Sequence, residues 1–498
     1  MNMKKLTILI LIGITVGSSL KGQINKKIST IDSMINIYTH YYGFCGTVLI
    51  EKKGKLILNK GYGYSSYELN IPASDSTKYH ICSISKGFTR VLIDGLINED
   101  KIKLDDKLFK YLPEIGEKIG NAVQIKHLLI HQSGLEEHFF DPLSRNTKID
   151  NIKSIKDSKL LFEPGSKEEY CNLNYYILGI IIERLTGHEL AFEYNEKIFK
   201  PLGMTDSYLD NVERMLKNMA VPHYTNQVNQ DDMFIHVYPK PNDKGFAAGG
   251  IIMTTQDLYK WIKAFHSNKF GLKVDDLRND NSNNYGKAYE NYSLGWETNG
   301  IKRRYIEGDG IGEGFRSLYL YFPDDSLTIL FLNNSYYFPA DYNTNRNYVL
   351  FDNVVYRSAD IMLDRKFTLP ELPVGQLLIE KIKKGNSVDA IVNEYNKLKN
   401  DSKSFIFDVK QLNSVAYFYL KNNNLDNAFK IFTLNLSEYP DSWIANDGIG
   451  EYFLRKGDRT NAIKYLDISL TNNPNKRREE RKMHDIRRDN IEILKTSN

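Results

Sequence analysis

The chain has 498 residues, of which 41% are hydrophobic and 26% are charged. These values indicate a folded protein of two or three domains, and they exclude a disordered chain or an integral membrane protein. Lys and Arg number 66 against 62 Asp and Glu, so the formal net charge is only +4. A nearly neutral chain gives no electrostatic basis for binding nucleic acid or a membrane surface, and we expect no nucleic-acid partner.

The first 22 residues have the pattern of an export signal. Lys4 and Lys5 precede an uncharged run over 6–20, and small residues then lead to Gln23. Secretory signal peptides have this order of segments, and the run is shorter than the roughly 20 apolar residues that span a bilayer. A short N-terminal membrane anchor is the alternative. We expect residues 1–22 to be a signal peptide and the protein to be exported, either periplasmic or secreted.

The three cysteines are Cys45, Cys82 and Cys171. An odd and small number does not make a disulfide framework, and no C-x-x-C pair is present. Export would allow one bridge, but we expect free, buried thiols, because Cys packs well as a small apolar residue.

The main domain is expected to begin and end with strand pairs. Residues 47–51 and 55–59 flank a short turn that contains Gly54, which predicts a hairpin. Residues 317–322 and 327–333 predict a second hairpin around a Pro-Asp-Asp-Ser turn. We therefore expect one sheet assembled from distant parts of the chain.

Helices are expected between these hairpins. Apolar residues recur at helical spacing over 174–186 and 255–266, and Thr255 is suited to cap the second helix. Residues 275–291 are polar and rich in Asn, so we expect a surface loop there.

The composition changes near residue 368, where two prolines in four positions break any helix. This predicts four parts: a signal peptide (1–22), a main domain (23–366), a linker (367–386) and a helical tail (387–498).

The tail contains a repeat with a period of 34 residues, the period of tetratricopeptide (TPR) repeats, in which small residues lie at helix contacts. Two unrelated helical hairpins are the alternative. Because about three repeats are needed for independent stability, we expect support from the main domain or from a third hairpin near 387–400. The charged segment 477–488 is expected to be a solvated helix face. The recurring positions are Ala416, Leu420, Ala428 and Pro440, followed by Gly450, Leu454, Ala462 and Pro474.

Several familiar motifs are absent, among them G-x-S-x-G, the phosphate-binding P-loop and H-E-x-x-H. The glycine-rich run 308–314 fits neither a dinucleotide nor a phosphate loop, and predicts backbone that something approaches closely. His127 and His131 are four apart but have no third ligand nearby. Packing or hydrogen bonding is therefore the better interpretation, and we expect no metal site.

The first catalytic signal is the pair Ser83 and Lys86, which share a face on a helix because they are three residues apart. A serine hydroxyl needs an adjacent base to become a nucleophile, and a lysine with a lowered pKa can be that base. A helix that begins near Ser83 would also direct a backbone N–H at an oxyanion. Alone, an S-x-x-K pair is weak support, because it arises by chance in a lysine-rich chain.

A second signal lies about ninety residues later, where a Pro-Gly turn at 164–165 precedes Tyr170 and Asn172. Tyr can relay a proton if nearby cations hold its pKa down, and Asn can hydrogen-bond both a substrate amide and a lysine. A half-buried structural tyrosine is the alternative for Tyr170.

Taken together, from about Phe44 to Asn334, these motifs resemble the serine β-lactamase and penicillin-binding-protein-like hydrolases of the class C type. The resemblance implies an α+β fold, with an antiparallel sheet flanked by helices and an all-helical subdomain beside the active site; here the TPR-like α-helical repeats follow it. The other segments that carry the resemblance are Lys60–Gly63, Leu128–Leu135, Pro201–Met204, Ala248–Gly250, Tyr292–Trp296 and Gly314–Phe315.

The resemblance also implies roles for single residues. Ser83 corresponds to the nucleophile, Lys86 and Tyr170 to the proton-handling pair, and Asn172 to a residue that contacts substrate. No metal or organic cofactor is implied.

One motif departs from the family. In the family the third motif is a basic residue or His, then any residue, then Gly. This chain has Gly308-Asp309-Gly310 at that place. By resemblance Asp309, Gly310 and Ile311 edge the substrate site, and the Ile311 N–H is an oxyanion donor. Gly308 and Asp309 cannot supply the missing positive charge; the basic residues at 302–304 and Arg316 are candidates to replace it.

We therefore expect an exported serine hydrolase that forms an acyl-enzyme with a D-amino-acid peptide, a β-lactam or an ester. The alternative is a catalytically impaired, β-lactamase-like binding protein that uses its cleft and TPR-like tail for cell-envelope interactions. A third possibility is an esterase with little peptidase activity, which would tolerate the missing cation because an ester need not carry a carboxylate. In each case a small-molecule or peptide substrate or ligand is expected, and a protein or cell-envelope partner of the tail is a hypothesis.

Overall fold

The computed structural model describes residues 3–137, 147–210, 216–226, 234–236, 245–267, 269–270, 291–298, 301–312, 314–338, 346–400 and 404–473. The chain forms two compact units. The first contains Met1–Thr225 and His236–Phe367, and the second contains Asn226–Ile235 and Thr368–Asn498.

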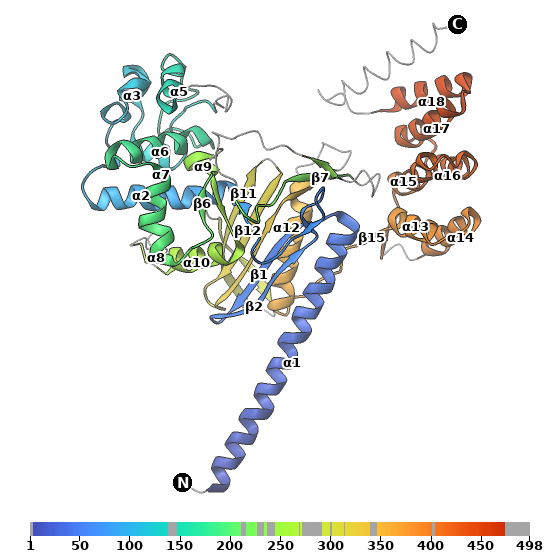
Figure 1. Cartoon of the computed structure of the whole chain (residues 1–498), viewed down its shortest axis with the longest axis horizontal. Helices are drawn as coiled ribbons and strands as arrows, with labels where there is room; N and C mark the ends of the chain where they lie inside the picture. Colours follow the sequence, from blue (N-terminus) through green and yellow to red (C-terminus); the bar gives the residue numbers. More distant parts are fainter. Residues whose placement is uncertain are drawn as a thin grey trace. The chain divides into compact units, whose positions relative to one another are not determined.

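A six-stranded antiparallel sheet organises the first unit (Figure 1). The first long strand of the chain lies beside the last one, with Gly46 opposite Asn333. Both expected hairpins are confirmed, as is a sheet assembled from distant segments. In spatial order the strands are β10 (Asn291–Thr298), β11 (Ile301–Gly312), β12 (Phe315–Phe322), β13 (Leu327–Asn333), β1 (Gly46–Lys52) and β2 (Lys55–Tyr62).

Helices cover the two faces of this sheet. On one face α1 (Met3–Tyr42) packs against α12 (Arg346–Met362), and α12 lies on β12 and β13. On the other face α10 (Thr255–His266) lies on β1 and β13. The residues expected as a signal peptide belong to the first half of α1, and their removal stays a prediction. Within the described residues, no helix combines the length and the apolar character needed to cross a membrane.

The two helices expected between the hairpins are present as α6 (Asn172–Thr186) and α10. The expected cap of α10 was wrong by one residue, because Thr254 accepts the Asp257 N–H at 3.3 Å. Thr255 instead donates its hydroxyl to Asn59 Oδ1, at 2.8 Å. The predicted loop 275–291 lies outside the described residues, except Asn291, which begins β10.

The remaining helices of the first unit form a helical region beside the sheet (Figure 1). The ring of Phe88 on α2 stacks on Trp261 of α10, with 3.6 Å between the ring centroids. This contact joins the helical region to the layer that covers the sheet. The helices are α2 (Ser85–Asn98), α3 (Glu117–Ala122), α4 (Ile125–Leu129), α5 (Lys148–Ser154), α7 (Leu190–Tyr194), α8 (Lys200–Leu202) and α9 (Phe246–Gly249).

Short strands lie between the helical region and the six-stranded sheet. β5 (Tyr79–His80) and β6 (Tyr208–Leu209) pair on either side of β9 (Ile251–Met253). The other short strands are β3 (Tyr64–Ser66), β4 (Ile71–Pro72), β7 (His223–Asn226), β8 (Phe234–His236) and β14 (Ser335–Phe338).

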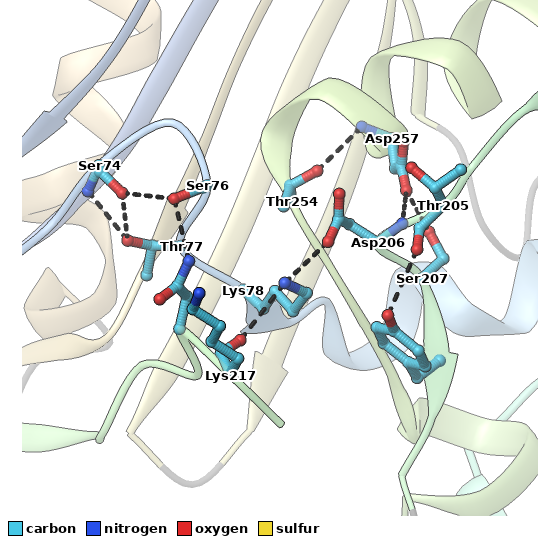
Figure 2. A network of polar contacts seen from close by, with 12 residues as sticks. Ser74, Ser76, Thr77, Lys78, Thr205, Asp206, Ser207, Lys217, Thr254 and Asp257 are labelled. Carbon is cyan, nitrogen blue, oxygen red and sulfur yellow. Dashed lines mark hydrogen bonds and ion pairs between the residues drawn. The ribbon is translucent and has the colours of Figure 1, made fainter. Parts of the chain in front are cut away.

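A polar network fixes the ends of these short strands (Figure 2). Lys78, just before β5, forms an ion pair with Asp206 at 2.8 Å, and its side chain is only 8% exposed. Asp257, at the start of α10, accepts hydrogen bonds from the Asp206 N–H (2.8 Å) and from the Ser207 hydroxyl (3.0 Å). The network therefore anchors β5, which leads directly to Ser83.

The second unit is helical and has its own apolar core, which includes Leu412, Phe432 and Ile449. Helix α17 begins at Trp443, 34 positions after α15 begins at Val409. Two helices, α13 and α14, precede these, and α13 lies in the segment expected as a linker. The TPR assignment stays a prediction, and residues 477–488 lie outside the described part. The elements are β15 (Leu372–Pro373), α13 (Val374–Lys383), α14 (Val388–Leu398), β16 (Phe405–Ile406), α15 (Val409–Lys421), α16 (Leu425–Glu438), α17 (Trp443–Lys456) and α18 (Arg459–Asn472).

Phe432→Ala is expected to destabilise the second unit by about 3–5 kcal/mol, because it removes a fully buried ring and leaves a cavity. Hydrogen exchange followed by mass spectrometry should show faster exchange in peptides of 409–472. Phe429→Ala, on the same helix but 40% exposed, is the matched control and should have a much smaller effect. Equal effects of the two substitutions would contradict the core described here.

Candidate active site

Ser83 lies in a single 3₁₀ turn (Cys82–Ile84) that leads into α2. The preceding residue, Cys82, has a φ of +52°, a left-handed conformation that is costly for a side chain other than glycine. Neighbouring contacts hold the turn in place, because Ser317 donates its hydroxyl to Ile81 O at 2.7 Å. Ser83 is therefore presented at a rigid, strained corner of the chain.

Lys86 is completely buried and lies three residues after Ser83, in the first turn of α2. Its Nζ lies 3.1 Å from Ser83 Oγ, 2.7 Å from Asn172 Oδ1 and 2.6 Å from Ala248 O. The last two partners are carbonyl oxygens, which can only accept hydrogen bonds. The amine is thus bound by Ser83, three residues earlier, and by groups from two distant segments.

Burial lowers the pKa of Lys86 to about 7, because the ammonium form loses its hydration. The carboxylate of Glu137 opposes this shift by stabilising the positive charge. A large fraction of Lys86 is therefore neutral near neutral pH, which a lysine in water is not.

Tyr170 and Asn172 complete the cluster, so the four expected residues are brought together. The Tyr170 hydroxyl lies 2.7 Å from Ser83 Oγ and 3.2 Å from Asn172 Oδ1. Loss of hydration raises the pKa of Tyr170, and the negative charges of Glu137 and Asp309 add to this effect. Tyr170 thus carries its proton at neutral pH.

Residues 131–134, in the Leu128–Leu135 segment that carries the family resemblance, position the Tyr170 segment. His131 Nδ1 accepts the Cys171 N–H at 3.1 Å, and its ring lies against the ring of Tyr170 with 4.5 Å between centroids. Burial and the nearby Lys86 lower the pKa of His131 to about 3, so it acts as a neutral acceptor. His127 Nδ1 accepts the Gln124 N–H at 3.2 Å. The expectation that both histidines serve in hydrogen bonding is confirmed.

Sequence reasoning missed Glu137. Its Oε2 accepts the Asn172 N–H at 2.7 Å, while Oε1 is buried and has no hydrogen-bond partner in the described part of the chain. Burial raises the pKa of Glu137, and the Asn172 N–H and Lys86 oppose that shift. No motif marks the residue; its proximity to the well-marked 131–134 segment was the one available signal.

The third motif lies on β11, which runs beside the Ser83 turn. Gly310 is packed so closely that a Cβ there would come within 2.9 Å of Ser83 N and 2.3 Å of Ile81 O. Asp309 is bound by Arg316, and Ile311 is 43% exposed at the surface. The expectation that something approaches this glycine-rich run closely is confirmed, and at Gly310 it is the backbone that carries Ser83.

All three cysteines are free and buried, as expected. Burial raises the pKa of the Cys82 and Cys171 thiols to about 12, so both are protonated. They fill space beside the cluster as small apolar groups.

The sequence matches the Beta-lactamase family over residues 40–352, and this match covers more than half of the chain. The chain belongs to the beta-lactamase family. The resemblance drawn from the motifs is thereby confirmed, and so is the expected fold, in which an antiparallel sheet is flanked by helices.

Among relatives in this family, Protein flp of Staphylococcus aureus is 29% identical over 299 residues, which are 58% of this chain and 59% of that protein. The chain thus spans about three fifths of that relative. The teichoic acid D-alanine hydrolase of Staphylococcus aureus is 29% identical over 294 residues, covering 58% of this chain and 70% of that protein.

Among solved structures, D-amino acid amidase from Ochrobactrum anthropi SV3 superposes with a TM-score of 0.55 and 17% identity. The superposition covers 68% of this chain and 99% of the amidase. At this identity the likeness concerns the beta-lactamase fold alone.

The buried lysine should make stability depend on pH. Above about pH 7 the unfolded chain holds a proton on Lys86 that the folded chain has released, so stability rises as pH increases toward 10. Relative to Lys86→Met, the wild type should gain about 3–4 kcal/mol in free energy of unfolding between pH 7 and pH 10. Urea unfolding at a series of pH values measures this.

Lys126→Met, which removes a lysine that is 36% exposed, is the control for a general effect of lysine loss. Parallel pH curves for wild type and Lys86→Met would contradict a folded-state pKa near 7.

Proposed function

We propose that the protein is a serine hydrolase that works through an acyl-enzyme, with Ser83 as nucleophile and Lys86 as its base. The observation that carries this proposal is the buried Lys86 amine, 3.1 Å from Ser83 Oγ and bound to two carbonyl oxygens. A neutral amine has two N–H groups and one lone pair. With both N–H groups engaged by Asn172 and Ala248, the lone pair faces the Ser83 hydroxyl.

In the first step Ser83 Oγ forms a bond to the substrate carbonyl carbon, and the Ser83 proton moves to Lys86 Nζ. The carbonyl oxygen becomes an oxyanion, for which the backbone N–H groups of Ser83 and Ile311 are the proposed donors. The close approach of β11 to the Ser83 turn supports this pairing.

In the second step the bond to the leaving group breaks, and the leaving atom takes a proton. Tyr170 is the proposed relay, since its hydroxyl is protonated and lies 2.7 Å from Ser83 Oγ. Lys86 then restores the proton to Tyr170. Water repeats the sequence in place of serine, which releases the acid and returns the Ser83 proton.

The proposed substrates are D-amino-acid peptides, β-lactams or esters. The name of one relative, teichoic acid D-alanine hydrolase, supports a D-alanyl substrate. The N-terminal pattern over 1–22 supports export to the periplasm or the exterior. The second unit is proposed to bind a protein or cell-envelope partner.

Intact-protein mass spectrometry tests this proposal. The protein is treated separately with an activated fluorophosphonate, a penicillin and a small acyl ester. We expect a covalent adduct of the fluorophosphonate with the wild type and none with Ser83→Ala, because the alanine has no hydroxyl to attack phosphorus. The reagent whose adduct forms and then disappears identifies the chemistry that is turned over. A folded wild type that forms no adduct with any reagent would leave the binding-protein alternative.

The rate of ester hydrolysis should rise with pH through a transition near 7, as Lys86 loses its proton. Glu137→Gln removes a negative charge that favours the ammonium form, so the pKa of Lys86 falls and the transition moves to lower pH, by about 0.5–1 unit. Glu136→Gln, an exposed neighbour, is the matched control and should leave the transition in place. A shift to higher pH in Glu137→Gln would contradict Lys86 as the base.

A further inference from the structure

The position at which the family has a cation is filled in this chain by an aromatic ring. A Cβ on Gly308 would come within 2.2–2.6 Å of the ring and hydroxyl atoms of Tyr319, which lies opposite on β12. Tyr319 is only 2% exposed and packs in the core. A lysine or histidine at 308 would require this ring to move. The packing of Tyr319 therefore excludes a basic side chain at this position.

The basic residues upstream do not replace that cation. Residues 302–304 lie four to six positions before Gly308 on the extended strand β11, which separates them from it by about 13–20 Å. Arg303 forms an ion pair with Asp325 at 2.9 Å, and Arg304 with Asp324 at 2.6 Å, both in the turn after β12.

Arg316 is near the site but is already neutralised. It is 7% exposed, and both of its terminal groups are used: it binds Asp352 of α12 at 2.7 and 2.9 Å and also binds Asp309. Two carboxylates thus share one guanidinium, so Arg316 has no unpaired positive charge to offer a substrate carboxylate.

The Asp309 carboxylate acts electrostatically on the catalytic residues. The Asp309 carboxylate is 46% exposed, and its charge disfavours ionisation of Tyr170 and favours the protonated form of Lys86. A carboxylate on a substrate that lies along β11 would meet this like charge. Among the flanking basic residues, Arg303, Arg304 and Arg316 are ion-paired, and Lys302 lies about 20 Å along the strand from Gly308.

From this arrangement we propose that the site selects acyl donors whose leaving group carries no carboxylate, that is, neutral or cationic esters and amides. This inference rests on the proposed acyl-enzyme chemistry of Ser83. It separates the proposed substrates into poor and good ones by the charge of the leaving group. Peptides with a free terminal carboxylate and β-lactams with a ring carboxylate are poor substrates, whereas esters and amides with an uncharged leaving group are good ones.

The test uses three thioesters that share one acetyl-D-alanyl group and differ in the leaving thiol: mercaptoacetate, mercaptoacetamide or thiocholine. Attack by Ser83 breaks the C–S bond, and the released thiol is measured directly. We expect kcat/KM for mercaptoacetamide and thiocholine to exceed that for mercaptoacetate by at least about tenfold. Equal values, or a preference for mercaptoacetate, would overturn the proposal.

Asp309→Asn should narrow the difference between mercaptoacetate and mercaptoacetamide severalfold, because it removes the like charge. Asp324→Asn, an ion-paired carboxylate in the turn after β12, is the matched control and should leave the ratio unchanged. An unchanged ratio in Asp309→Asn would remove Asp309 from the explanation and overturn the electrostatic argument.

The two proposals fail differently. If no thioester is turned over and the fluorophosphonate forms no adduct on Ser83, the acyl-enzyme proposal is wrong and the selectivity falls with it. If the adduct forms and the thioesters are hydrolysed without regard to charge, the acyl-enzyme proposal stands and only the selectivity is wrong.

Discussion

The candidate site depends on one amine that is kept away from water. Lys86 has no solvent exposure, and moving an ammonium group into such surroundings costs several kcal/mol, which the chain reduces by letting the group lose its proton. The neutral amine still needs hydrogen-bond partners. Ser83, Asn172 and Ala248 supply them from the turn before α2, the start of α6 and the end of α9. Any displacement of these three segments leaves a buried polar group without a partner.

This requirement explains why the segments around Lys86 are held by hydrogen bonds and strand pairing. The 131–134 segment binds the backbone at Cys171, and the short sheet β5–β9–β6 fixes the approach to the Ser83 turn. The left-handed Cys82 is a strained residue that persists because its neighbours on both sides are held in place. The helical region and the sheet therefore act together to hold a geometry that neither would maintain alone.

Much of this arrangement could be predicted from the sequence, because it depends on local patterns. The two hairpins follow from short apolar runs on either side of turn residues, and Ser83, Lys86, Tyr170 and Asn172 stand in short motifs with fixed spacing. Glu137 and Tyr319 could not be found in this way. Glu137 matters because of where a loop places it, and Tyr319 matters because a β-ladder puts it opposite a glycine. Such contacts are defined by tertiary packing, and no spacing along the chain reveals them.

The pairing of β1 with β13 has a consequence for how the chain acquires its structure. Where these two strands begin and end, the Cys45 N–H donates to Ser335 Oγ, a residue 290 positions later. During synthesis the first strand has no neighbour on that side until nearly the whole first unit has been made, and contacts of such long range form slowly. A chain of this topology cannot complete its central sheet until most of the first unit has been translated, so the closing of that sheet is a late event in folding.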